Sequence, residues 1–138
     1  MKKLFLDTNI VIDLLAQREP FYADAANLFS LADKKQIELS VSSLTIANTS
    51  YQLLKQMDTS KMKSILRNLR LLLSVHSLND KIIGLALNDE TFSDFEDGMQ
   101  HFTALDNGHD IIITRNLKDF KNSKLPTMNA KQFVETFK

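Results

Sequence analysis

The sequence contains no cysteine and no tryptophan, and it has only three glycines and two prolines. Without cysteine, disulfide bonds and thiolate zinc sites are excluded, and a reducing, cytoplasmic location is expected. The three glycines, Gly84, Gly98 and Gly108, are isolated from one another, so no glycine-rich phosphate loop is present. This scarcity argues against a nucleotide-dependent function.

The chain also lacks an excess of charge and a long apolar run. Its 17 basic and 17 acidic residues balance, whereas many nucleic-acid-binding proteins are clearly basic. The apolar run that precedes Asp7 is too short for a signal peptide or a membrane span. We therefore expect no membrane partner. A length of 138 residues predicts one domain, residues 1–138.

Strand-like apolar runs alternate with helical patterns along the chain. The runs predict strands at residues 3–6, 37–41, 74–77 and 110–114, and a short fifth at 125–128. Strands separated by helices need crossover connections, which favours a three-layer α/β/α fold around a mostly parallel sheet.

Two of the intervening helices carry specific predictions. The helix after residue 43 is expected to bury a stripe of Leu44, Ala47, Tyr51 and Leu54. The later helix is expected to begin with a capping box in which Glu96 reaches back to Ser93, and to turn Phe95, Met99, Phe102 and Leu105 inward.

Carboxylates stand where the predicted strands end. Asp7 directly follows residues 4–6, Asp119 lies just past residues 111–113, and Asp94 and Asp97 begin a helix. Parallel sheets bind ligands outside the carboxyl ends of their strands. Mg²⁺ and Mn²⁺ prefer oxygen ligands, and such ions activate water and neutralise phosphate charge. The pattern predicts a Mg²⁺ or Mn²⁺ site that hydrolyses a phosphate ester.

Each of these residues also has a structural alternative. Asp7 could cap the helix that follows it, and for Asp94 capping is favoured over metal binding. Asp97, further into its helix, is favoured as a ligand. Asp119 could instead be a surface charge in a turn. His101, four residues after Asp97, is expected to be a partly exposed polar residue rather than a ligand.

The segment after the fourth predicted strand adds polar candidates. Thr114 is expected to orient a ligand or a water molecule, and Asn116 to cap a short helix. No Gly-x-Ser-x-Gly turn is present, and the histidines have no evident serine partner, so a serine hydrolase triad is not indicated.

Three segments in order resemble the PIN domain family, in particular the stand-alone nucleases of the VapC toxin type. The segments are LFLDTNIVIDLL, DFEDGMQ and IITRNLKDF. The resemblance covers essentially the whole chain and implies an α/β/α fold with a parallel sheet. It implies Mg²⁺- or Mn²⁺-dependent cleavage of single-stranded RNA, a homodimer, and an antitoxin partner that holds the toxin inactive. By position, it assigns the metal-binding acids to Asp7, Asp97 and Asp119, an accessory role to Asp94, and the polar residues of the closing motif to Thr114 and Asn116.

The sequence departs from the family pattern at Asn48. The family usually has a segment like Ser-Leu-Thr-Ile-Ala-Glu, and here the segment SLTIAN ends in asparagine. The loss of one negative charge is expected to weaken metal affinity, and Asp94 could partly compensate. The alternative function is a catalytically weak module that binds RNA or a protein partner. A phosphoacceptor aspartate is less favoured, because Asp7 ends the first strand and no acidic pair precedes it.

Basic residues that would hold RNA are weakly indicated. Lys55, Lys61 and Lys63 lie in a basic stretch and are candidates for contacting the RNA backbone, although solvated helix faces are the favoured explanation of that stretch. Arg115 is expected to sit closer to the scissile phosphate.

Overall fold

The structure is a computed structural model that describes residues 1–137. The strands within this range are β1 (Lys3–Leu6), β2 (Glu38–Ser42), β3 (Ser74–His76), β4 (Ile111–Ile113) and β5 (Thr127–Met128). The helices are α1 (Thr8–Leu15), α2 (Tyr22–Asp33), α3 (Ser43–Leu53), α4 (Thr59–Leu69), α5 (Asp80–Asn88), α6 (Phe95–Asp106), the 3₁₀ helix η1 (Leu117–Phe120) and α7 (Ala130–Phe137).

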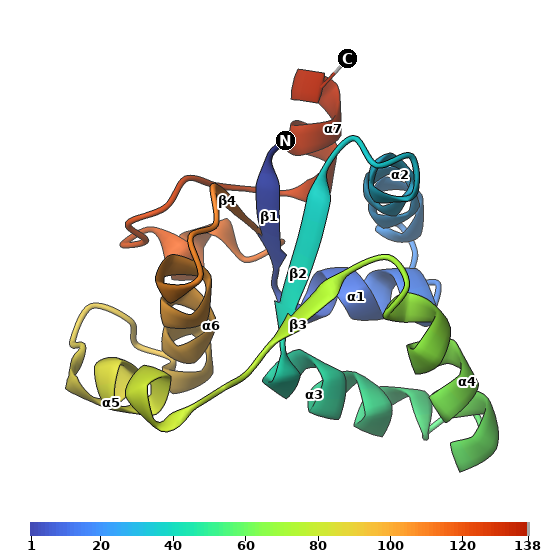
Figure 1. The fold of residues 1–138 in the computed structure, drawn as a ribbon, viewed down its shortest axis with the longest axis horizontal. Coiled ribbons are helices and arrows are strands. Elements are labelled where there is room, and N and C mark those ends of the chain that lie inside the picture. Colours follow the sequence, from blue (N-terminus) through green and yellow to red (C-terminus); the bar gives the residue numbers. More distant parts are fainter. Residues whose placement is uncertain (138) are drawn as a thin grey trace.

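The five strands form one parallel sheet in the order β3-β2-β1-β4-β5 (Figure 1). Leu4 of the central strand pairs with Leu39 on one side and with Ile111 on the other. The chain builds outward from β1 first toward β3 and later toward β5, so the strand order switches between β1 and β4. A ligand site is expected outside the carboxyl ends of these two strands.

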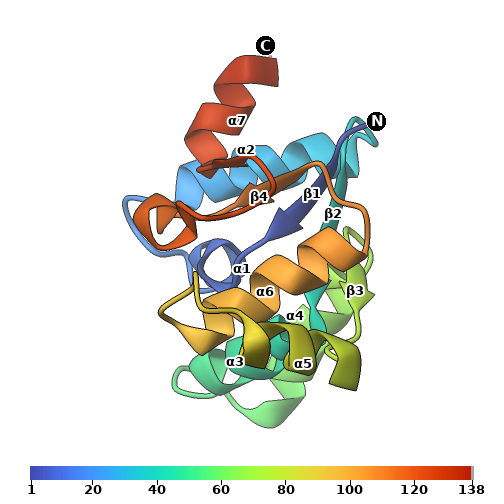
Figure 2. The ribbon, with the colours of Figure 1, turned by 90° about the vertical axis from the view of Figure 1, so that its left-hand side faces the viewer.

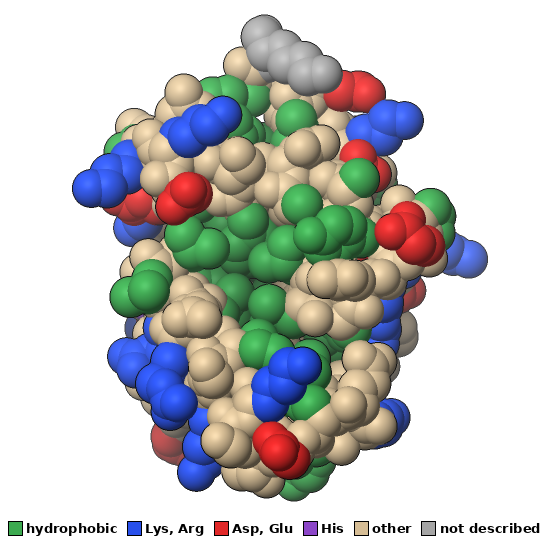
Figure 3. Space-filling model, turned by 90° about the vertical axis from the view of Figure 1, so that its right-hand side faces the viewer, with side chains coloured by type: hydrophobic (Ala, Val, Ile, Leu, Met, Phe, Trp, Pro, Cys, Tyr) green, Lys and Arg blue, Asp and Glu red, His purple; other side chains and the backbone are tan. Residues whose placement is uncertain are grey.

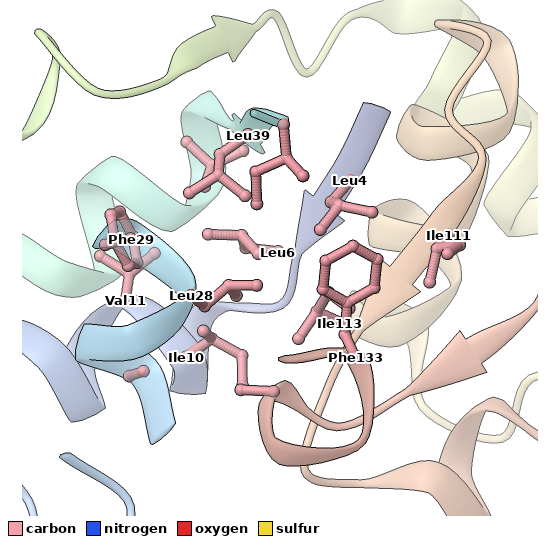
Figure 4. Packing of buried hydrophobic residues seen from close by; sticks show 14 of the residues in the cluster. Leu4, Leu6, Ile10, Val11, Leu28, Phe29, Leu39, Ile111, Ile113 and Phe133 are labelled. Carbon is pink, nitrogen blue, oxygen red and sulfur yellow. The ribbon is translucent and has the colours of Figure 1, made fainter. Parts of the chain in front are cut away.

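Helices cover both faces of the sheet, which confirms the predicted three-layer α/β/α fold. Side chains alternate along β1: Leu4 and Leu6 join a large apolar core with α1, α2 and α7 (Figure 4), whereas Phe5 faces Ala104 of α6. Helix α5 packs on α6, outside the sheet layer (Figure 2). Across residues 1–137, every helix is too short or too polar to cross a bilayer.

The buried face of α3 differs from the prediction. Thr45, Thr49 and Leu53 are buried, whereas Tyr51 is 72% exposed and Leu54 is also exposed. Apolar spacing was misleading because this helix buries the side chains of two threonines, and the hydroxyl of Thr45 is hydrogen-bonded in the interior to Thr8 and Gln100.

The start of α6 also differs. The cap is Asp94 rather than Ser93, and its Oδ1 accepts a hydrogen bond of 3.0 Å from the backbone N–H of Asp97. Aspartate caps a helix as well as serine does, so the helix begins one residue later than the capping box predicts. Phe95 consequently lies at the exposed first turn, with 44% of its surface accessible.

His101 is buried, which contradicts its predicted partial exposure. Only 1% of its surface is accessible. Its Nε2 accepts a 3.1 Å hydrogen bond from the backbone N–H of Lys124, and its ring lies 4.7 Å from that of Phe92. Burial lowers the pKa of the imidazole. His101 therefore fastens the segment before β5 to α6.

Candidate metal-binding site

An open cavity of about 440 Å³ lies at the carboxyl ends of β1 and β4. Four separate parts of the sequence line it with acids and amides. The acids are Asp7, Asp94, Glu96, Asp97 and Asp119, and the amides are Asn9, Asn48, Gln52 and Asn116. The fold thus brings together the predicted acids from all three motifs, although their roles as ligands stay predictions.

Asp7 is the most deeply buried acid of the cavity, with 6% of its surface exposed. Its Oδ1 accepts a 2.8 Å hydrogen bond from the backbone N–H of Thr8 and so caps α1, while its Oδ2 accepts one of 2.8 Å from the hydroxyl of Thr114. Burial raises its pKa, and the two hydrogen bonds and the nearby Arg115 oppose that rise. The alternative that Asp7 caps the following helix is therefore confirmed. Each oxygen of its carboxylate still has a lone pair that can bind a cation.

Thr114 and Asn116 connect this carboxylate to the closing motif. Thr114 is fully buried; its hydroxyl donates to Asp7 and accepts a 3.0 Å hydrogen bond from the backbone N–H of Asn116. Asn116 stands at the N-cap position of η1, but its side chain makes no capping hydrogen bond. The predicted capping role of that side chain is therefore wrong, because the amide lines the cavity instead.

Asp97 carries the clearest sign of uncompensated charge. Its side chain is half-buried, and burial together with the carboxylates of Asp94, Asp7 and Asp119 raises its pKa to about 7. The adjacent Glu96 adds to the effect. Neutral carboxylic acids bind divalent cations poorly, so a cation that entered here would displace a proton and relieve the repulsion.

A buried polar network that sequence reasoning missed lies below the cavity. The Nε2 of Gln100 donates to the hydroxyls of Thr8 and Thr45 at 3.1 and 3.0 Å, and these hydroxyls are 2.8 Å apart. Gln100 lies one turn beyond Asp97 and is 1% exposed. The network joins α6, α1 and α3, the three helices whose first turns or faces carry the cavity residues.

Glu96 was also missed as a site residue. It lines the cavity, and its Oε1 accepts a 2.7 Å hydrogen bond from the side-chain amide of Asn48. Burial and the carboxylates of Asp94 and Asp7 raise its pKa, and the amide of Asn48 opposes that rise. Its position beside Asp97 in the second motif was the available signal.

The predicted RNA-binding residues are not part of the cavity wall. Lys55, Lys61 and Lys63 are exposed near the end of α3 and on α4. The guanidinium of Arg115 makes two hydrogen bonds to the carboxylate of Asp13, at 2.7 and 3.1 Å, and lies 3.9 Å from the ring centre of Phe21.

A basic residue that sequence reasoning overlooked, Arg18, does line the cavity. It follows α1, in the connection to α2. No local pattern distinguished it from other surface arginines, because its place beside the acids depends on how α1 packs against α3.

The donors in the cavity suit a hard divalent cation in kind, since they are carboxylate and amide oxygens. Among residues 1–137, no three acidic, histidine or cysteine side chains already stand close enough together to enclose one ion. Asp119 is exposed and Asp97 half-exposed, so both have room to turn toward Asp7.

Comparisons with known proteins agree with this geometry. Residues 3–118 match the family model of the PIN domain. Ribonuclease VapC1 of Aquifex aeolicus (strain VF5) is 24% identical over 138 residues, which cover 97% of this chain and 94% of that protein.

Solved structures share the fold. VapBC-1 from nontypeable Haemophilus influenzae superposes with a TM-score of 0.70 at 19% identity, covering 93% of this chain and 98% of that one. VapC20 of Mycobacterium tuberculosis, described as a toxin that cleaves the sarcin-ricin loop, gives a TM-score of 0.67 at 16% identity, covering 88% and 95%. Because the family model spans most of the sequence, the chain belongs to the PIN domain family.

Proposed function

We propose that this protein is a divalent-metal-dependent ribonuclease that cleaves single-stranded RNA, and that it is the toxin of a toxin–antitoxin pair. The observation that carries the proposal is the gathering of Asp7, Asp97 and Asp119 around one cavity at the switch point of a parallel sheet. The similarity to Ribonuclease VapC1 supports ribonuclease chemistry, and the structural likeness to a toxin that cleaves the sarcin-ricin loop supports the toxin role.

Mg²⁺ or Mn²⁺ bound in the cavity would supply an activated water and neutralise charge on the phosphate. The chain's own residues would hold that ion in place. Asp7 has a fixed orientation, because Thr8 and Thr114 each bond one of its oxygens. Asp97 would lose the proton that its raised pKa favours, and Asp119 would approach from η1.

The substrate would enter through the open side of the cavity. We propose a single strand as the substrate because that is the substrate which the resemblance to the VapC-type nucleases implies. Arg18 is placed to contact an RNA phosphate close to the acids, whereas Lys55, Lys61 and Lys63 could contact the backbone only farther along the strand.

Partners and location complete the proposal. We assign residues 1–138 to one PIN-like domain that acts in the cytoplasm, forms a homodimer and is held inactive by an antitoxin. Apolar side chains gather in a hollow on the face that carries α1, α2 and α4 (Figure 3). Leu14 and Leu15 of α1 and Leu66 of α4 are only partly buried, and an apolar segment of an antitoxin or of a second copy would cover the apolar hollow.

The test uses end-labelled single-stranded RNA with Mn²⁺, with and without EDTA. The wild type should cleave only with metal, and Asp7→Asn should reduce the rate at least about 10²-fold, since loss of groups that orient a metal already costs 10–100-fold. Asp33→Asn, an exposed acid at the end of α2, is the matched control and should cleave normally. Equal cleavage by wild type and Asp7→Asn would point to a contaminant, and RNA binding without cleavage would favour the weak binding module.

A further inference from the structure

The hydrogen bond between Asn48 and Glu96 links two helices that are far apart in sequence. Asn48 lies on α3 and Glu96 in the first turn of α6, and the side-chain amide of Asn48 donates to Oε1 of Glu96 at 2.7 Å. Both residues line the acid cavity. The family usually has a glutamate at the position of Asn48. In this chain the residue there is hydrogen-bonded to a glutamate of another helix, Glu96 of α6.

The chemical types at the two positions are complementary. Two carboxylates at such a short separation repel, and one of them would take up a proton near neutral pH. An amide at position 48 removes that repulsion and supplies a donor instead. A glutamate at position 96 is therefore compatible with an amide at position 48, whereas a glutamate at position 48 would repel it.

The other oxygen of Glu96 is available to a cation. Among residues 1–137, Oε2 of Glu96 takes part in no hydrogen bond or ion pair. Asp94, the acid first expected to compensate for Asn48, caps α6 through the N–H of Asp97, whereas the amide of Asn48 donates to Glu96. Consecutive helical residues diverge by about 100°, so Glu96 and Asp97 extend to different parts of the cavity wall.

We propose that Glu96 supplies the carboxylate that this chain lacks at position 48, and that Asn48 is its positioning residue. The negative charge of the site is then moved from α3 to α6 rather than lost. The inference rests on the proposed function, since it concerns a carboxylate that faces the divalent cation.

The experiment measures Mn²⁺ binding by isothermal titration calorimetry, without RNA. Glu96→Gln should weaken binding about 10-fold or more, whereas Glu90→Gln, an exposed acid before α6, should leave it unchanged. Asn48→Ala should weaken binding by a smaller factor. The exchange Asn48→Glu/Glu96→Gln restores an amide–carboxylate pair with the charge at position 48, and should recover the affinity to within about threefold.

Thermal unfolding in EDTA checks that each variant is folded. If Glu96→Gln alone destabilises α6, the exchange variant still tests whether a carboxylate at either of the two positions is enough for Mn²⁺ binding. Wild-type affinity in Glu96→Gln would overturn the inference and leave the proposed function standing. A wild type that neither binds Mn²⁺ nor cleaves RNA would overturn both.

Discussion

Asp7 and Asp13 are two buried acids at opposite ends of α1, and their surroundings differ completely. Asp13, 1% exposed, accepts hydrogen bonds from Nε and Nη2 of the Arg115 guanidinium. Asp7, 6% exposed, has hydrogen bonds but, among residues 1–137, no ion-pair partner, and its neighbours in the cavity include Asp97 and Asp119. A buried acid with its own cation is a structural pair. A buried acid such as Asp7, which shares a cavity with further acids and lacks its own cation, indicates a functional site.

The largest expected effect comes from breaking the structural pair. Arg115→Met leaves the carboxylate of Asp13 buried without its cation, which should lower the free energy of unfolding by about 3 kcal/mol. Urea denaturation at pH 7 measures it. Lys118→Met makes a similar change at an exposed position and should cost less than about 0.5 kcal/mol.

The double variant Asp13→Leu/Arg115→Met sharpens this prediction. Removing both charges leaves no unpaired group, so most of the lost stability should return. If Arg115→Met is as stable as the wild type, water already screens the carboxylate of Asp13. Asp13 would then not depend on Arg115, and the contrast with Asp7 would not hold.

Much of this arrangement could be predicted from the sequence, because it depends on local patterns. The runs at residues 4–6 and 111–113 predict buried strands, and crossover connections make those strands parallel. Asp7 and Asp119 then fall at the same edge of the sheet. That Asp7 and Asp119 lie at one edge of the sheet therefore follows from topology, before any side-chain contact is known, and their roles as ligands stay predictions.

The pairings could not be predicted, because each joins side chains that are distant in sequence. Asp13 meets Arg115 across 102 positions, and Asn48 meets Glu96 across 48. Thr45 is buried because Gln100 and Thr8 satisfy its hydroxyl, and a search for apolar stripes overlooks such a residue. Single-sequence patterns report periodicity, whereas these contacts depend on how the helices pack.

The polar network under the cavity should contribute a smaller effect. Thr45→Val keeps the shape of the side chain but removes its bonds to Gln100 and Thr8, which should lower the free energy of unfolding by about 1 kcal/mol. Thr127→Val, on β5, is the control, because within residues 1–137 its hydroxyl makes no hydrogen bond to other side chains or backbone. If both variants match the wild type in urea denaturation, the network does not stabilise the joint between α3 and α6.

The smallest expected effect comes from a residue of the acid cavity, Asp97. Its substitution should raise the free energy of unfolding, whereas the substitutions above lower it. Burial and neighbouring carboxylates raise the pKa of Asp97 from 3.8 to about 7, so between these values the folded state binds more protons than the unfolded state. Stability from this group is therefore lost as pH rises from about 4 to about 7. Without divalent metal, Asp97→Asn should be more stable than the wild type at pH 8, by less than about 1 kcal/mol because solvent screens this half-exposed group.

Thermal unfolding in EDTA at pH 5 and pH 8 measures the effect, with Asp33→Asn as the exposed control. The advantage of Asp97→Asn should shrink at pH 5, where the wild-type carboxyl is protonated, and should disappear or reverse when Mn²⁺ is added at pH 8, because the cation stabilises the charged wild type. A variant less stable than the wild type in EDTA at pH 8 would show that Asp97, like Asp13, is already compensated. Asp97 would then resemble Asp13, and the contrast between an acid paired with its own cation and the acids of the cavity would no longer hold.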